Sequence, residues 1–403
     1  MLNLKSFLLE GGNLPFLINP KKPTEGTRVA DSIKISRRDK ERPEFQDFFK
    51  SLDDAFEKTH GHNLYGNALR NNSHYAGSSA LYANPEVSSD DLKDSGDMDS
   101  QIPKGYKGKL EDFLKVGQKY GKFTVVHSTK GKNQTHAIIK HKDSGEHHQI
   151  DFEPVDYDED KQEPTPGEKL LHNTHIDDAK QGLKGVYHKL LMQAILHGHS
   201  FPAIISSMKG RGKARAEVQE EGSVPKHTLS VDNGVRKKYR QIGEKDGKPI
   251  VKEIPTSESE YSKDVPTIYR ALFRRDPSAK DLEDMHSFGG LINHIKEHIP
   301  EEKHGKIFRT FAKKLWSKDS QAVALNPSSD REIKERAYNV LAGHFPEQHN
   351  AHKDEIEELK NEYYAPGQKR FSGEIRPDKP SQDSGTIPKI SEAILPRIKR
   401  IFQ

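Results

Sequence analysis

The sequence predicts a mixed α/β chain of the α+β type, in which helices flank a mixed β-sheet and a C-terminal helical domain follows. Three stretches carry this prediction. Apolar residues recur every three or four positions in 43–60, as they do on one face of a helix. Residues 122–154 contain three runs rich in β-branched residues, separated by turn signals. Residues 265–345 return to helical spacing.

Composition limits the classes of protein that fit. The 403 residues suffice for two or three domains, but only 32% are hydrophobic and 31% are charged, so we expect long polar loops. The absence of cysteine excludes disulfides, thiolate zinc sites and cysteine nucleophiles, and it favours a reducing compartment. No apolar run approaches the roughly 20 residues that span a bilayer, and no signal peptide is evident. We therefore expect a cytoplasmic protein without membrane contact.

The N-terminal part leads up to a glycine-serine turn. Residues 1–42 are expected to form an arm with a short helix at 2–9. The helix at 43–60 buries one face, formed by Phe45, Phe48, Phe49, Leu52 and Phe56. A short helix at 63–71 precedes Gly77-Ser78-Ser79, whose small residues would let backbone N–H groups approach phosphate oxygens.

Three aspartates follow this turn. Side chains two residues apart on a strand share one face, so Asp97 and Asp99 would project together, roughly 6.5 Å apart along the backbone. Asp151 lies between Ile150 and Phe152 and is predicted to be the polar side of another short strand. Three carboxylates are sufficient to hold two Mg²⁺ ions over a triphosphate.

The remaining core elements are predicted in order. Residues 108–120 are expected to form a helix, followed by strands at 122–128, 135–141 and 147–154. With the strand at Asp97 these make a four-stranded mixed sheet. An amphipathic helix at 177–197 ends before Gly198 and completes a core at 43–200.

A glycine-serine turn, an Asp-x-Asp strand and a lone Asp on a later strand, in that order, resemble the DNA polymerase β-type nucleotidyltransferase superfamily. The likeness covers residues 65–200, and an enlarged loop at 84–94 would absorb the long gap between Ser78 and Asp97. Segments 4–13, 182–191 and 230–236 are also similar to nucleotidyltransferases encoded by large tailed phages. The expected location is then the host cytoplasm.

The resemblance implies transfer of a nucleoside monophosphate from an NTP, with ATP favoured, to an acceptor hydroxyl with Mg²⁺ or Mn²⁺. Asp97 and Asp99 would coordinate both metals, and Asp151 would join one of them. Gly77 and Ser78 would hold the triphosphate. Further phosphate contacts are assigned to Lys184, Lys189 and Arg236.

The second half of the chain is expected to form separate regions. Residues 201–264 form a basic loop and strand region, and the basic residues between Lys209 and Arg240 favour RNA as the acceptor. Residues 265–362 form a helical domain with helices at 268–273, 280–298, 306–316 and 330–343. Residues 363–403 form a flexible tail with a short amphipathic segment near its end.

Two alternative functions remain open, and one competing aspartate pattern is disfavoured. A second Asp-x-Asp pattern at 156–160 lies among acids close to Pro164 and Pro166, which indicates a solvated loop. The sequence His294-x-x-Glu297-His298 fits a zinc metallopeptidase helix, with Glu332, Glu335 or Glu357 as the third ligand. The chain also fits a non-catalytic phage or host-interaction protein that retains the nucleotidyltransferase fold.

Overall fold

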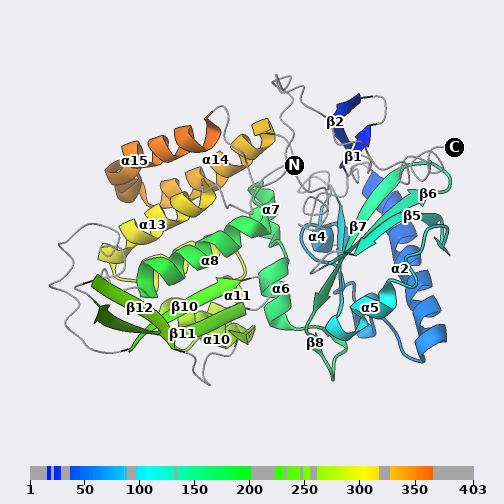
Figure 1. Cartoon of the computed structure of the whole chain (residues 1–403), viewed down its shortest axis with the longest axis horizontal. Helices are drawn as coiled ribbons and strands as arrows, with labels where there is room; N and C mark the ends of the chain where they lie inside the picture. The colour runs from blue at the N-terminus through cyan, green and yellow to red at the C-terminus, as the bar shows by residue number, and fades with distance from the viewer. Residues whose placement is uncertain are drawn as a thin grey trace. The chain divides into compact units, whose positions relative to one another are not determined.

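The computed structural model describes residues 16–19, 22–28, 37–85, 87–88, 97–130, 134–200, 223–230, 234–245, 248–254, 261–316 and 327–365. These residues form an α+β structure (Figure 1). They fall into two compact units that divide between Pro164 and Thr165. Among the described residues, no helix combines the length and the apolar character that crossing a bilayer requires.

A five-stranded mixed sheet forms the centre of the first unit, in the order β3-β7-β6-β5-β4. Strand β3 runs parallel to β7, and the other neighbouring pairs are antiparallel. The three strands predicted between 122 and 154 are confirmed, and the short β4 makes the sheet one strand wider than expected. The bounds are β3 Met98–Pro103, β4 Lys119–Tyr120, β5 Phe123–Lys130, β6 Thr135–His141 and β7 His147–Val155.

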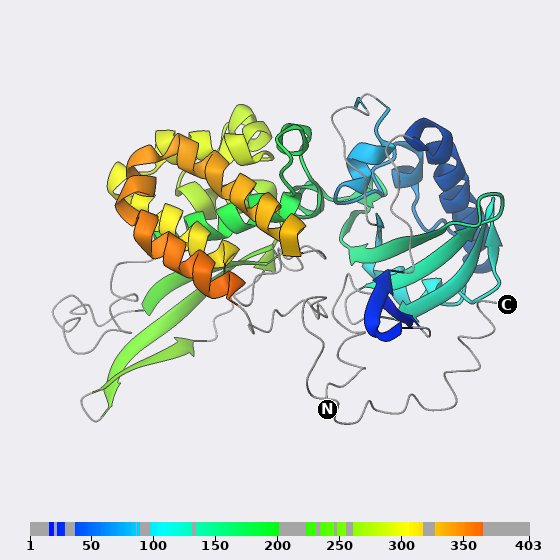
Figure 2. The same cartoon turned by 90° about the horizontal axis from the view of Figure 1, so that it is seen from above.

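Helix α2 (Arg38–His60) covers one face of this sheet, as Figure 2 shows. The predicted aromatic face is fully or almost fully buried. Phe45 stacks on Phe123 of β5 at 5.1 Å between ring centroids, and Phe48 meets the same ring edge-on at 5.8 Å. The Arg38 guanidinium donates to the backbone carbonyls of Tyr82, Asn84 and Val87. The first turn of α2 therefore holds the segment that follows the glycine-serine turn.

Short elements complete the first unit. Strands β1 (Phe16–Asn19) and β2 (Lys22–Arg28) form a hairpin within the predicted arm. The others are α3 Asn67–Arg70, α4 Ser79–Ala83, the 3₁₀ turn η3 Lys104–Tyr106, α5 Lys107–Leu110, β8 Tyr157–Asp158 and β9 Glu163–Pro164. The acidic run at 156–160 spans β8 and the turn after it, where Asp158 accepts from the backbone N–H groups of Asp160 and Lys161.

The helix predicted at 108–120 is wrong, because only α5 is helical there. Leu110 and Leu114 are both fully buried, but turns rather than a continuous helix bring them into the core. Gly117 has φ +94°, a conformation that ends helical geometry. Burial of Leu110 and Leu114 accounts for part of the apolar pattern, but Val116, which also belongs to it, is 66% exposed.

The second unit is built around helix α8 (Gly185–Ser200), which packs against α10, α12, α13 and strand β10 (Figure 1). Its sheet has the order β10-β11-β12, and β13 pairs with β11. The strands are β10 Ser223–Ser230, β11 Gly234–Lys245, β12 Lys248–Ile254 and β13 Tyr261–Ser262. The helices before α8 are α6 Pro166–His172 and α7 Ile176–Lys180, and those after it are α10 Val265–Phe273, α11 Ala279–Asp284, α12 Phe288–His298, α13 Glu301–Leu315, α14 Pro327–His344 and α15 Pro346–Tyr364.

Two boundaries in the second unit differ from the sequence expectation. The core was expected to end at 200, but α8 buries its apolar face among the C-terminal helices, so the division falls at Pro164. The single helix expected at 280–298 is divided into α11 and α12. The break is stabilised by two N-terminal contacts: the Ser287 side chain accepts from Gly290 N, and Asp178 accepts from Phe288 N.

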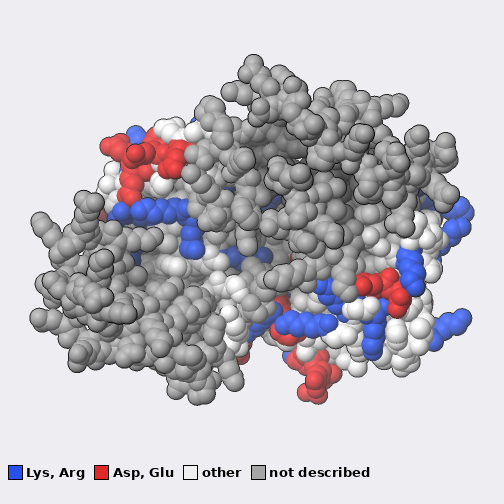
Figure 3. All heavy atoms as spheres, viewed as in Figure 1, with Lys and Arg blue, Asp and Glu red and all other residues white. Residues whose placement is uncertain are grey.

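Charge is mixed on the visible surface. On the described surface in Figure 3, Lys and Arg side chains lie among Asp and Glu side chains, which agrees with a net charge of +4 from 65 basic and 61 acidic residues. The predicted helix at 2–9, most of the loop at 84–94, the basic residues 209–215 and the tail from 366 lie outside the described residues.

Candidate metal and nucleotide site

Two acidic residues and one histidine form a row across three neighbouring strands. Asp99 of β3 pairs with Asp151 of β7, and Asp151 pairs with His136 of β6. Side chains alternate along a strand, and the residues on either side of these aspartates, such as Met98 and Ile150, belong to the core under α2. The row therefore lies on the sheet face opposite α2.

Asp97 completes the group from the residue directly before β3. Asp97, Asp99 and Asp151 each offer a carboxylate oxygen, and these oxygens lie within 4.8 Å of one another. Asp151 is only 3% exposed, whereas Asp97 and Asp99 are partly exposed. The structure thus brings together the three aspartates that the sequence singled out, with one buried and two accessible from solvent.

The glycine-serine turn lies directly against this cluster. Gly77 has φ +56°, and a Cβ atom placed on it would lie 2.4 Å from Asp99 Oδ2. The turn is fixed to β3 by hydrogen bonds from Ala76 N to Asp99 O (3.1 Å) and from Asp99 N to Ser79 Oγ (2.9 Å). Glycine is favoured at this positive φ, and the absence of a Cβ atom permits this close an approach to the carboxylate. Ser78, the N-cap of α4, follows next.

Two side chains hold Asp151 in place, and sequence analysis missed both. His136 Nδ1 donates to Asp151 Oδ1 at 2.8 Å, and Gln149 Nε2 donates to the same oxygen at 2.7 Å. Both contacts are buried, so solvent screens them little. The sequence located this hairpin but not its register. In the structure His141 N bonds Glu146 O across the turn, and counting outward from that pair places His136 opposite Asp151.

The three basic residues assigned to phosphate belong to the second unit. Lys184 is exposed just before α8, and Lys189 is half-buried on it. Arg236 lies in β11 opposite Thr228, and its side chain is outside the described part of the structure. Their role in binding phosphate stays a prediction. The apolar residues of segment 182–191 are buried in the core of the second unit.

The second unit contains another group of metal-ligand type, formed by Asp281, His294 and His298. It includes both histidines of the predicted zinc metallopeptidase pattern, but none of the three glutamates expected as third ligand belongs to it. Glu332 pairs with Arg336, and Glu335 and Glu357 both approach Lys360. Within the described part of the chain these two groups are the ones with metal-ligand spacing, so the acids at 156–160 form none.

Comparison of this chain with protein-family models, with curated proteins and with solved structures found no match.

Proposed function

We propose that this chain is a nucleotidyltransferase, which transfers a nucleoside monophosphate from an NTP to an acceptor hydroxyl at the cluster of Asp97, Asp99 and Asp151. One observation carries the proposal: three carboxylates from separate parts of the sequence converge beside the Gly77 turn. The mixed sheet, with β3 parallel to β7, supports a nucleotidyltransferase-like fold.

The donor set fits a hard divalent cation. All three ligands are carboxylates, which Mg²⁺ and Mn²⁺ prefer over softer metals. When bound, such an ion would neutralise phosphate charge and lower the pKa of an acceptor hydroxyl. Asp97 and Asp99 are the accessible ligands, so the triphosphate would enter from their side, and Asp151 would hold the inner position.

The proposed reaction needs only the NTP and the acceptor as reactants. The acceptor oxygen forms a bond to the α-phosphorus, the bond between that phosphorus and the oxygen bridging to the β-phosphate breaks, and pyrophosphate leaves with the electron pair. The hydroxyl proton passes to Asp151. Since His136 and Gln149 both donate to Oδ1 of Asp151, the proposal assigns ligand and proton-acceptor roles to Oδ2.

The turn at Gly77 supports a binding role for the backbone. Its close approach to Asp99 would bring the triphosphate, held over Asp97 and Asp99, near the N–H groups of residues 77 and 78. ATP is the favoured nucleotide and RNA the favoured acceptor, the latter on the basic residues between Lys209 and Arg240. A protein side chain or a small molecule is the alternative acceptor.

The test is transfer of label from NTPs labelled at the α-phosphate. The full-length chain is incubated with each of the four NTPs, Mg²⁺ or Mn²⁺, and total RNA or protein, and the labelled fraction is identified. We expect metal-dependent labelling of RNA, reduced at least about 1,000-fold by the double change Asp97→Asn with Asp99→Asn.

The matched control is Asp156→Asn with Asp158→Asn, which removes both Asp-x-Asp pairs of the acidic run at 156–160 and should leave transfer unchanged. Metal-dependent NTP binding without any transfer would favour the non-catalytic protein instead. If the protein neither binds nor transfers any of the four NTPs, the proposal is overturned.

A further inference from the structure

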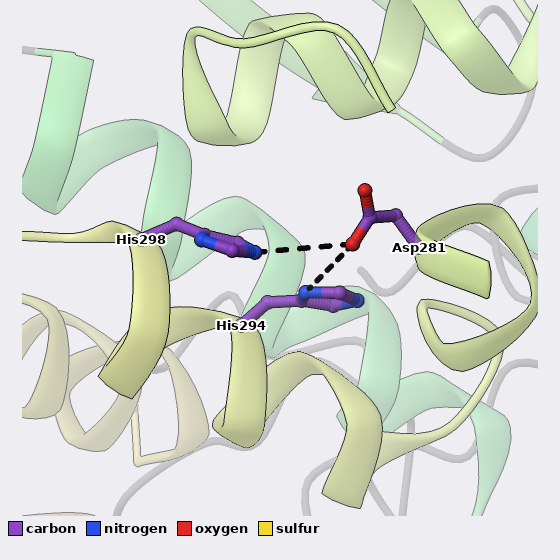
Figure 4. A group of neighbouring side chains, drawn as sticks. All are labelled: Asp281, His294 and His298. Atoms are coloured by element: carbon purple, nitrogen blue, oxygen red, sulfur yellow. Dashed lines mark ion pairs between the residues drawn. The ribbon is translucent and has the colours of Figure 1, made fainter. Parts of the chain in front are cut away.

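Helices α11 and α12 place three potential metal ligands together in the second unit. His294 and His298 lie one turn apart on the same face of α12, and their rings stack 5.3 Å apart (Figure 4). Asp281, from α11, points between them, with its Oδ1 atom 3.8 Å from His294 Nδ1 and 3.8 Å from His298 Nε2. These separations are too long for hydrogen bonds.

The same separations suit an ion between the three groups. Zinc binds imidazole nitrogen and carboxylate oxygen at about 2.0–2.1 Å, so two ligand atoms of a tetrahedral site lie roughly 3.3 Å apart. All three ligand atoms here lie within 4.8 Å of one another. Small rotations of the side chains would close the group around one ion, with no movement of the helices.

The environment of His294 indicates that an ion binds here. Its side chain is buried, at 3% exposure, and both of its ring nitrogens are buried without a hydrogen-bond partner. Buried polar side chains nearly always have a partner, and an exception requires an explanation. A metal ion at Nδ1 would supply this partner, on the side where Asp281 and His298 already lie.

Asp281 is held in the orientation that a ligand needs. Its Oδ2 atom accepts from Ser278 N at 2.7 Å, as part of the capping box that begins α11. The other oxygen, Oδ1, is the atom directed at the two histidines. One oxygen therefore fixes the side chain, and the other is available to an ion.

We propose that Asp281, His294 and His298 form a binding site for a zinc-class divalent ion, separate from the carboxylate cluster. Two imidazoles and one carboxylate favour Zn²⁺ over Mg²⁺, because nitrogen ligands select transition metals. Three protein ligands leave one coordination position for water. Glu297, the general base of the metallopeptidase pattern, has its Oε2 atom 3.9 Å from His298 Nε2, but its side chain is 72% exposed and is not a ligand in this proposal.

Arg275 is the competitor for this site. Its guanidinium donates to His298 Nε2, the nitrogen that faces Asp281, and lies 3.4 Å from Asp281 Oδ2. A cation there repels a bound metal ion, but the side chain is 40% exposed and can turn into solvent. The proposal therefore predicts that removal of this charge strengthens metal binding.

The test measures Zn²⁺ binding by calorimetry, with Co²⁺ absorption as the spectroscopic probe, on full-length protein treated with chelator. The background is Asp97→Asn with Asp99→Asn, so that the carboxylate cluster contributes little. We expect one equivalent of Zn²⁺ and the intense visible bands of low-coordinate Co²⁺. Binding should weaken about 100-fold in Asp281→Asn and in His298→Gln. It should strengthen about tenfold in Arg275→Gln.

Two controls make the result decisive. Glu297→Gln lies on the same helix and should bind Zn²⁺ as the background protein does. Asp281→Asn keeps an oxygen for the Ser278 cap, and an unchanged far-UV spectrum and melting temperature would show that it folds. Absence of Zn²⁺ binding in the background protein, or equal binding in folded Asp281→Asn, would overturn the proposal.

Discussion

The two groups of potential metal ligands in this molecule differ in both their donors and their scaffold. The first unit offers three carboxylates on a sheet, with backbone of the Gly77 turn alongside. The second offers two imidazoles and one carboxylate on helices. Carboxylates alone suit Mg²⁺ and an anionic substrate that Mg²⁺ can bind, whereas imidazoles select zinc-class ions. Ligand chemistry therefore predicts that one chain sorts two kinds of metal.

The two groups also differ in how the fold brings their residues together. On α12 the two histidines are neighbours simply because they are four residues apart. On the sheet, Asp99, Asp151 and His136 become neighbours only through the pairing of three strands. The following predictions separate the chemical and the positional contributions of the residues in the sheet cluster.

The largest effect is expected for Asp151→Asn. The amide keeps the size of the side chain but cannot accept the hydroxyl proton and is a weaker metal ligand. We expect kcat to fall about 1,000-fold, while binding of an NTP with Mn²⁺ changes less than about threefold. Steady-state kinetics and equilibrium binding on the same preparation measure both. An equal loss of binding would contradict the role given to Asp151.

Gly77→Ala should reduce turnover by about 10- to 100-fold, because the added Cβ would lie 2.4 Å from Asp99 Oδ2 and must displace that carboxylate. Gly145→Ala is the matched control. Gly145 also has positive φ, +76°, but open space surrounds its Cβ position. Both variants should lose roughly 1 kcal/mol of stability, and only Gly77→Ala should lose activity. Similar activity in the two variants would contradict the contact with Asp99.

In the second unit, Asp178→Asn should increase stability at high pH. Burial raises the pKa of Asp178 to about 7 from its usual 3.8, while Oδ1 accepts from Phe288 N at the start of α12. The unfolded chain therefore loses this proton first, and folding is penalised increasingly as pH rises from about 4 to about 7. Asparagine keeps the hydrogen bond and removes the penalty.

The gain in unfolding free energy for Asp178→Asn should grow by roughly 2 kcal/mol between pH 5.5 and pH 8, measured by urea denaturation. Asp177→Asn is the control, since that neighbouring side chain is 63% exposed and its replacement should change stability less than Asp178→Asn does. A gain that is constant with pH would show that the Asp178 carboxyl is not the group that titrates.

The smallest effect on turnover is expected for His136→Ala, about tenfold in kcat with KM little changed, because His136 positions Asp151 and does not contact substrate. His136→Asn should recover part of the loss if its amide reaches Asp151. The control is His147→Ala, on the same face of β7 but beyond Gln149. A change in KM alone would contradict a positioning role.

Much of the fold followed from patterns that depend on neighbours in sequence. Helix α2 and strands β5, β6 and β7 matched their predicted positions closely, since each has a continuous apolar face. The false helix at 108–120 and the boundary at 200 had a different origin. In both, the sequence showed that residues are buried but not what covers them, and for α8 the cover is the C-terminal helices.

The candidate sites were predictable to a similar extent. The order of Gly77, Asp97, Asp99 and Asp151 was sufficient to propose the carboxylate cluster, and the histidine pair was visible from its spacing. The residues that hold or complete the two clusters were not predictable from the sequence. The position of His136 depends on the register of the hairpin. The position of Asp281 depends on the break between α11 and α12, where the sequence pattern predicted one continuous helix.

Anomalous scattering tests the central claim most directly. Crystals of the full-length chain would be soaked with Mn²⁺, one equivalent of Zn²⁺ and an NTP analogue with a methylene between the α- and β-phosphates. Data on both sides of each absorption edge distinguish the metals. We predict manganese at Asp97, Asp99 and Asp151, beside the triphosphate and the Gly77 turn, and zinc at Asp281, His294 and His298. A triphosphate bound elsewhere, with no manganese at the three aspartates, would contradict the proposed function.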